Sequence, residues 1–215
     1  MAKLSILLVD DHAVVRSGFK VLLQTWDDVE VLAEASSGEE ALPLYTQHRP
    51  DVVVMDLAMA GMGGIEATKR LLTLDARARV LALSAHEDSS YAKRALQAGA
   101  LGYLSKRAAP EVLIDALRMV ARHQRFIDPL IAQRMANQHH DSDAQQIDKL
   151  SPREFEVFLQ LAKGRSVLDI SQALGLSSST VGTHLYKVKQ KLQLHNQSEM
   201  TLLAMRHGLL DDANP

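Results

Sequence analysis

The 215-residue sequence contains no cysteine, which excludes disulfide bridges and metal sites built on thiolates. Long hydrophobic runs are also missing, because no stretch approaches the roughly 20 apolar residues of a membrane-spanning helix. The first apolar run, from Leu4 to Val9, is short and two aspartates follow it directly. It therefore predicts a buried strand rather than a signal peptide. We expect a soluble, cytoplasmic protein with no membrane partner.

Acidic and basic residues nearly balance, with a net charge of −2, but they are unevenly distributed. Residues 1–123 have a net charge of −2 and residues 124–147 of −1, whereas residues 149–191 hold seven Lys and Arg against three Asp and Glu. This local surplus of +4 is the only electrostatic indication of a polyanionic partner. The length of the chain fits two small domains.

The first 123 residues alternate short apolar runs with amphipathic segments. The apolar runs occupy residues 5–9, 29–34, 52–55, 80–83 and 101–104. Between them, apolar residues recur at helical spacing, as at Val15, Phe19 and Leu22. Five strands that alternate with five helices predict an α/β domain, in which helices cover both faces of a parallel sheet.

The rest of the chain has a different character. Residues 124–147 are rich in Gln, His, Asp and Asn, and they predict a polar linker with a helix over residues 129–137. Residues 148–212 carry the signals of four short helices, which predict a compact all-α bundle. Each helix is expected to begin at a capping Ser or Asn: Ser151, Ser166, Ser177 or Ser178, and Asn196. Three helix ends are marked by glycine: Gly164, Gly175 and Gly208.

Polar residues stand at the ends of four predicted strands. Asp10 and Asp11 follow the first apolar run, Asp56 the third, Ser84 the fourth and Lys106 the fifth. Because the carboxyl ends of parallel strands meet at one edge of a sheet, we expect these side chains to lie together. Three carboxylates repel one another unless a divalent cation neutralises them, and their hard oxygens suit Mg²⁺. With a hydroxyl and an ammonium beside them, they predict a phosphoryl pocket in which one carboxylate is the nucleophile.

Four stretches of this domain, ILLVDDH, VVVMDLAMAGMGG, VLALSA and GALGYLSK, resemble the signature sequences of response-regulator receiver domains. The resemblance implies a flavodoxin-like, five-stranded parallel sheet of order 2-1-3-4-5 over residues 1–123. It implies that Asp56 is the phosphoacceptor and that a sensor histidine kinase is the donor. It also implies Mg²⁺ or Mn²⁺ as the cofactor, bound by Asp11, Asp56 and the backbone carbonyl of Ala58.

The same resemblance implies roles for the other polar residues of the pocket. Asp10 would help to hold the metal or its water. Ser84 would contact a phosphoryl oxygen, and Lys106 would pair with the phosphate. Tyr103 matches the switch position of the family, whose ring turns inward when Ser84 moves.

The loop after Asp56 departs from the pattern of the family. Ala60 stands where a proline is usual, and Gly63 stands where an aspartate is usual. The loss of the proline predicts a more flexible loop. Ala85, by contrast, is small, as the family requires for access of the phosphoryl group.

The third predicted helix of the second domain has two different faces. An apolar stripe formed by Val181, Leu185, Val188 and Leu192 must face the other helices. The opposite face and its flanks are polar and basic, which suits docking in the major groove of DNA. The candidates for DNA contact are Ser179, Thr183, Tyr186, Lys187, Lys189 and Lys191.

The segment LSPREFEVFLQLAKGRSVLDISQALGLSSSTVGTHLYKVKQKL closely resembles the LuxR-type helix-turn-helix, although Gly182 stands where a lysine is usual. A receiver joined to this domain is typical of the NarL/FixJ subfamily of bacterial two-component response regulators. The resemblance implies a transcription regulator, not an enzyme, that binds double-stranded promoter DNA. Phosphorylation would promote a homodimer, through residues 198–206, and RNA polymerase is a further expected partner.

Three other functions are open. A phosphotransferase or phosphatase with an aspartate nucleophile would need a second acid two residues after it, where this chain has Ala58. An adaptor that uses a receiver fold only for docking would not need the complete set of acids, hydroxyl and ammonium. A small-molecule-sensing LuxR-type regulator would have a sensor domain without this acidic cluster.

Overall fold

The computed structural model describes residues 3–85, 89–137, 147, 149–207 and 209–210. The chain divides into two compact units, residues 1–133 and residues 134–215. In the part of the chain that the structure describes, no helix is both long and apolar enough to cross a membrane.

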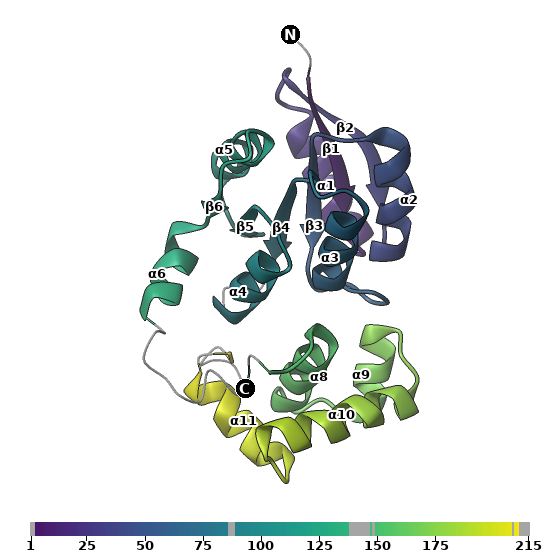
Figure 1. The fold of residues 1–215 in the computed structure, drawn as a ribbon, viewed down its shortest axis with the longest axis vertical. Helices are drawn as coiled ribbons and strands as arrows, with labels where there is room; N and C mark the ends of the chain where they lie inside the picture. The colour runs from purple at the N-terminus through teal and green to yellow at the C-terminus, as the bar shows by residue number, and fades with distance from the viewer. Residues whose placement is uncertain (1–2, 86–88, 138–146, 148, 208, 211–215) are drawn as a thin grey trace. The chain divides into compact units, whose positions relative to one another are not determined.

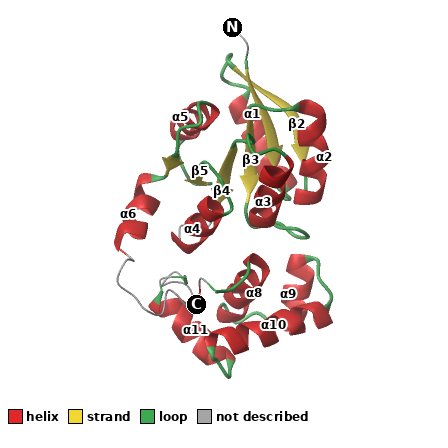
Figure 2. Ribbon diagram, viewed as in Figure 1, coloured by secondary structure: helices red, strands yellow, loops and turns green. Residues whose placement is uncertain are grey.

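The N-terminal unit is a parallel sheet with helices on both faces (Figures 1 and 2). Its strands lie in the order β2-β1-β3-β4-β5-β6. The strands are β1 (Leu4–Val9), β2 (Val29–Ala35), β3 (Val52–Asp56), β4 (Val80–Ser84), β5 (Gly102–Ser105) and β6 (Phe126–Ile127). The helices of this unit are α1 (Ala13–Leu23), α2 (Gly38–His48), α3 (Gly64–Leu74), α4 (Ser89–Gln97) and α5 (Pro110–Ala121).

The middle of the sheet is the most deeply buried part of the N-terminal unit. Every residue of β3 and β4 is buried, as expected for strands that have helices on both sides. A buried apolar cluster joins alternate residues of β1, β3 and β4, such as Ile6 and Leu8, to Leu117 and Val120 of α5. The predicted α/β architecture and the order of the first five strands are confirmed.

The sheet has a sixth strand that the sequence analysis did not predict. β6 lies among the residues expected to form the linker, and it pairs in parallel with β5, with Phe126 opposite Gly102 and Ile127 opposite Tyr103. The N–H of Asp128 donates to the carbonyl of Tyr103 at 3.0 Å. A two-residue strand is too short to show an alternating pattern, so only its backbone partners reveal it.

The predicted helix over residues 129–137 is α6 (Pro129–Asn137). It begins one residue after Asp128, whose carboxylate accepts a hydrogen bond from the N–H of Leu130 at 3.0 Å. Ile131 of this helix is fully buried. The next part of the predicted linker, residues 138–146, lies outside the described residues.

The C-terminal unit contains the four predicted helices: α8 (Pro152–Ala162), α9 (Val167–Leu174), α10 (Ser178–Leu192) and α11 (Gln197–Arg206). Their side-chain caps are Ser151, Ser166, Ser177 and Asn196, which confirms the predicted starts and selects Ser177 over Ser178. α9 ends at Gly175, which is in the left-handed conformation with φ of 61°. Gly208, the predicted end of the fourth helix, lies outside the described residues.

Candidate functional site

The carboxyl ends of the strands bring the predicted polar residues of the receiver together. Lys106, directly after β5, places its Nζ 2.6 Å from Asp10 Oδ2 and 2.8 Å from Asp56 Oδ2. Asp10 and Asp56 are each only 2% exposed. Ser84 is fully buried at the end of β4, and its carbonyl accepts a hydrogen bond from the N–H of Lys106 at 2.8 Å. The prediction that these distant residues converge at one sheet edge is confirmed.

At this edge of the sheet, burial and the neighbouring charges shift the pKa values of Asp56 and Lys106 in opposite directions. Burial raises the pKa of Asp56, and the nearby ammonium of Lys106 only partly offsets this effect. Burial lowers the pKa of Lys106, but its attraction to Asp56 and Asp10 outweighs burial and leaves the pKa raised. Lys106 is therefore a permanent cation at neutral pH, held between two buried acids.

The loop after β3 is fixed by two backbone hydrogen bonds to the acids. The N–H of Ala58 donates to Asp56 Oδ1 at 3.1 Å, and the N–H of Ala60 donates to Asp11 Oδ2 at 3.0 Å. A proline at position 60 has no N–H to donate, so the departure from the family pattern supplies this second bond. The loop is therefore held to Asp11 by a hydrogen bond, but it lacks the rigidity that a proline would give.

The acidic cluster fits a divalent cation. Ligand atoms from Asp10, Asp11, His12 and Asp56 all lie within 4.8 Å of one another. Asp11 Oδ1 is buried and accepts no hydrogen bond, whereas Asp56 Oδ2 has the ammonium of Lys106 beside it at 2.8 Å. Buried carboxylate oxygens without donors are costly unless a cation lies beside them. The donors are mainly hard oxygens, which suit ions such as Mg²⁺.

His12 is a member of this cluster that the sequence analysis did not single out. Its Nδ1 lies 2.7 Å from Asp11 Oδ1. The signal in the sequence was the run Asp10-Asp11-His12 itself, in which a possible nitrogen ligand directly follows two oxygen ligands. A histidine after a strand is so often solvated that the run alone did not indicate a contact.

Tyr103, the residue at the expected switch position, lies in β5 between Ala82 of β4 and Ile127 of β6. Its side chain is fully buried. The carbonyl of Tyr103 accepts a hydrogen bond from the N–H of Asp128. Tyr103 therefore joins β5, the strand before Lys106, to the segment that follows β6.

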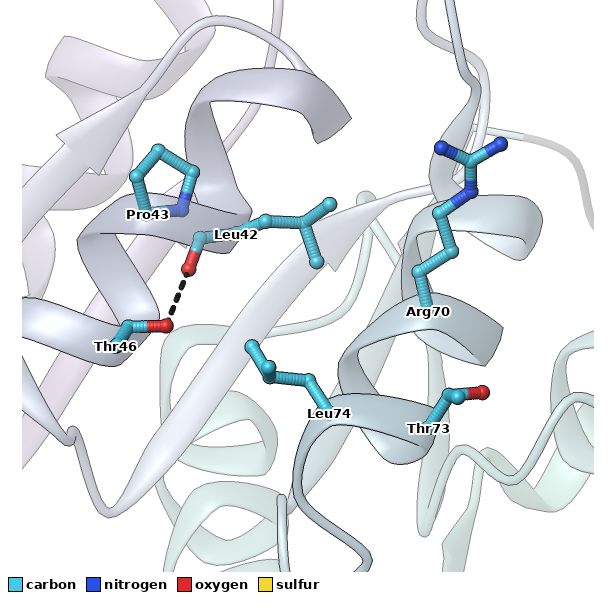
Figure 3. Close-up of a pocket in the computed structure, with 6 residues that line it drawn as sticks. All are labelled: Leu42, Pro43, Thr46, Arg70, Thr73 and Leu74. Carbon is cyan, nitrogen blue, oxygen red and sulfur yellow. Dashed lines mark hydrogen bonds between the residues drawn. The ribbon is translucent and has the colours of Figure 1, made fainter.

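A separate hollow of about 570 Å³ lies between α2 and α3 (Figure 3). Leu42 of α2 and Leu74 of α3 stand on its two sides, and Thr46 turns its hydroxyl back to the carbonyl of Leu42 at 3.1 Å. The one charged residue of its lining, Arg70, is paired with Glu66 at 2.9 Å. The lining of this hollow has no carboxylate to bind a metal or to accept a phosphoryl group, so the hollow does not compete with the acidic cluster as a site of phosphoryl chemistry.

α10 has the two faces that its sequence predicts. Val181, Val188 and Leu192 are buried, and Leu185 is partly buried. The outward face exposes four of the candidate DNA contacts: Ser179, Thr183, Tyr186 and Lys187. Gly182 has open space around the position that a Cβ would take.

The remaining two candidate lysines are engaged within the unit. Lys189 Nζ donates to the carbonyl of His195 at 2.8 Å. Lys191 Nζ lies 2.6 Å from Glu154 Oε2 and donates to the carbonyl of Lys149 at 3.1 Å. A contact with a DNA phosphate would compete with these partners for each ammonium group.

Comparison with known families agrees with both units. The model of the response regulator receiver domain matches residues 6–118, and the model of bacterial regulatory proteins of the luxR family matches residues 148–204. The chain belongs to the NarL/FixJ family of response regulators, and it is a DNA-binding transcription regulator under the control of phosphorylation. This assignment excludes a LuxR-type regulator with a different sensor domain.

Several relatives resemble the chain over nearly its whole length. It is 39% identical to the response regulator UvrY of Escherichia coli K12 over 208 residues, which are 96% of this chain and 95% of UvrY. It is also 39% identical to the response regulator GacA of Pseudomonas aeruginosa over 216 residues, which are 98% of this chain and 100% of GacA. Among solved structures, the response regulator ChrA of a heme-sensing two-component system is 32% identical, with a TM-score of 0.57, and covers 98% of this chain and 100% of ChrA.

Proposed function

We propose that Asp56 accepts a phosphoryl group from a sensor histidine kinase and thereby controls DNA binding. The nitrogen–phosphorus bond of the donor breaks as a bond forms from phosphorus to a carboxylate oxygen of Asp56, and the donor imidazole keeps the released electron pair. The observation that carries this proposal is the buried contact of Lys106 with both Asp10 and Asp56. An ammonium fixed at this place attracts the three charged oxygens of an incoming phosphoryl group.

Asp10, Asp11, Asp56 and the backbone carbonyl of Ala58 are the residues that would hold Mg²⁺ or Mn²⁺. The buried oxygen Asp11 Oδ1, which accepts no hydrogen bond, supports this assignment. When bound, the ion would neutralise the carboxylates and the phosphoryl oxygens. Ala58 and Ala60 hold the carboxylates in place through their N–H groups.

The switch needs more than the pairing of Lys106 with the phosphate. Two unit charges about 4 Å apart attract by roughly 4 kcal/mol at an effective dielectric constant of about 20. Lys106 is already paired with two acids, so phosphorylation gains only part of this energy. A two-state equilibrium needs roughly 5.5 kcal/mol to move from 1:99 to 99:1. A hydrogen bond from Ser84, the rearrangement of Tyr103 and formation of a homodimer supply the rest in this proposal.

The receiver takes up a phosphoryl group but does not turn over as an enzyme in this proposal. A phosphatase of the aspartate type needs an acid two residues after its nucleophile, and that position here is Ala58. The side chain of Ala58 can neither donate nor accept a proton. We therefore expect about one phosphoryl group per chain and slow hydrolysis, as suits a cytoplasmic signal carrier.

For the C-terminal unit we infer that α10 enters the major groove of promoter DNA. Its exposed face would place Ser179, Thr183 and Tyr186 against bases and backbone, with Lys187 on a phosphate. Lys189 and Lys191 would contact phosphates after leaving their present partners. Because one copy carries a surplus of only +4 in this region, a dimer that doubles the phosphate contacts is expected to bind far more tightly. RNA polymerase is the further partner that a promoter-bound regulator would meet.

The experiment that tests the receiver half is labelling of the full chain with acetyl phosphate and Mg²⁺, followed by a DNA shift assay. We expect the wild type to gain one phosphoryl group and to bind DNA more tightly, and Asp56→Asn to do neither. Asp51→Asn, which changes a partly buried aspartate at the opposite end of β3, is the matched control and should label normally. Labelling of Asp56→Asn at the wild-type level would contradict the proposal.

The DNA half is tested by Lys187→Ala. Removing one phosphate contact should weaken binding to all sequences alike and reduce the slope of log affinity against log salt by about 1 per DNA-bound copy. Lys163→Ala, which changes an exposed lysine after α8, should leave both quantities unchanged. An unchanged affinity and slope in Lys187→Ala would remove Lys187 from the interface.

A further inference from the structure

The side chain of His12 lies where a further protein ligand of the metal site would lie. Its Nδ1 is 2.7 Å from Asp11 Oδ1 and 3.6 Å from Asp10 Oδ1. Ligand atoms bound at about 2.1 Å around one transition-metal ion are separated by roughly 3.0–3.4 Å in octahedral and tetrahedral sites. The spacing of these three atoms is therefore close to that of neighbouring ligands around one ion.

The short contact between His12 and Asp11 is at ion-pair distance but lacks the alignment of a hydrogen bond. Asp11 Oδ1 is buried and accepts no hydrogen bond, even though the ring nitrogen is 2.7 Å away. The other oxygen of Asp11 is held by the N–H of Ala60, so the free oxygen stays directed toward the ring. Two such atoms, close together without hydrogen-bond alignment, are placed as neighbouring ligands of one cation would be.

His12 is fixed through its backbone, and its ring lies within ion-pair distance of both Asp10 and Asp11. The N–H of His12 donates to Asp10 Oδ1 at 2.8 Å, which keeps the residue beside the acids. His12 stands at the N-cap of α1 but its side chain caps no helix N–H. The side chain is 66% exposed, so an ion can enter from solvent on this side.

We propose that His12 is a ligand of the metal site and shifts its preference toward borderline transition metals, such as Ni²⁺ and Zn²⁺, relative to Mg²⁺. The inference rests on the metal site of the proposed function and adds a selectivity to it. Mg²⁺ prefers oxygen ligands and keeps much of its water, whereas imidazole nitrogen suits Ni²⁺ and Zn²⁺. The nitrogen of His12 beside three carboxylates therefore strengthens the binding of Ni²⁺ and Zn²⁺. It leaves the binding of Mg²⁺ almost unchanged.

The test uses the full chain and the displacement of Mn²⁺, followed by the electron paramagnetic resonance signal of free Mn²⁺. Mg²⁺ and Ni²⁺ are each titrated against bound Mn²⁺, in the wild type and in His12→Ala. We expect the Ni²⁺ affinity of His12→Ala to fall by about tenfold or more, because even indirect partners of a metal contribute that much. The Mg²⁺ affinity should change by less than about twofold.

His123→Asn is the control, because it removes another exposed histidine of the same unit. Asparagine tolerates the positive φ of 59° at that position, so the fold should be kept. This variant should leave both affinities unchanged. Equal Ni²⁺ affinity in His12→Ala and wild type, or an equal loss for both ions, would overturn the role of His12 while the metal site stands. Failure of the wild type to bind Mn²⁺ or Mg²⁺ would overturn the metal site and this inference together.

Discussion

Asp11 links the metal site to the loop after β3. One of its oxygens accepts a hydrogen bond from the N–H of Ala60, and the other is buried without a donor. A carboxylate in this position is stabilised when a cation arrives. The receiver should therefore be more stable with its metal than without it.

Mg²⁺ is expected to raise the free energy of unfolding of the receiver by about 2.7 kcal/mol at a concentration a hundredfold above its dissociation constant. Asp11→Asn should lose most of this gain, because the amide carries no charge to hold the ion. Urea unfolding of the full chain, followed by the fluorescence of Trp26 in this unit, measures it. Asp115→Asn, an exposed aspartate of α5, should keep the full gain. A metal-induced gain that is the same in Asp11→Asn and wild type would contradict this account.

At the residue scale, the sequence predicted the acids of the cluster and Lys106, but not His12 or all of the hydrogen-bond partners. Strand ends and the parallel topology were sufficient to bring Lys106 to Asp10 and Asp56. The bond from Ala60 to Asp11 could not be predicted, because it depends on the path of a loop. The engagement of Lys191 with Glu154 was also beyond the sequence, since it joins residues 37 positions apart on two helices whose packing sets the distance.

At the scale of elements, α8 carries a buried acid that the pattern of the helix did not indicate. Burial raises the pKa of Glu156 to about 7, and the neighbouring Arg153, which donates a hydrogen bond to it, only partly offsets burial. An unfolded chain would release this proton near the ordinary value of 4.5. Between those two pH values the folded form holds more protons than the unfolded form.

The free energy of unfolding of α8 and its neighbours should therefore fall as the pH rises from about 4.5 to about 7. Above about pH 7, the ionisation of Glu156 should change this free energy little. The expected loss is on the order of 2 kcal/mol. Glu156→Gln, which cannot ionise, should remove this dependence. Hydrogen exchange of the amides of α8 at several pH values, corrected for intrinsic rates, measures it in this unit alone. Identical pH profiles for Glu156→Gln and wild type would show that Glu156 is not the group responsible.

Most elements could be predicted because their signals are local. The capping residues fixed the starts of α8, α9, α10 and α11, and apolar runs fixed five of the strands. β6 was missed because two residues inside a polar segment carry no periodic signal, and only the edge of β5 gives them a partner. The open space at Gly182 shows that its departure from the family is not imposed by packing within the unit.

At the scale of the whole molecule, the two units divide the function. The N-terminal unit holds the site proposed to accept a phosphoryl group. The C-terminal unit holds the helix proposed to contact DNA. Among the described residues, the acidic cluster is built from the N-terminal unit and α10 from the C-terminal unit, so control of one by the other requires a change in conformation or in assembly. Beyond Lys106 the chain forms α5 and then β6, which pairs with β5 and leads into α6.

Beryllofluoride, which mimics a bound phosphoryl group, allows the whole account to be tested in one sample. The full chain is examined by sedimentation and by titration with promoter DNA, with Mg²⁺ present and with or without beryllofluoride. We predict that the mimic doubles the mass and tightens DNA binding at least about tenfold, in line with the gain of roughly 1.4 kcal/mol or more that a working switch requires. The same mass and the same DNA affinity in both conditions would contradict the claim that the acidic cluster controls DNA binding.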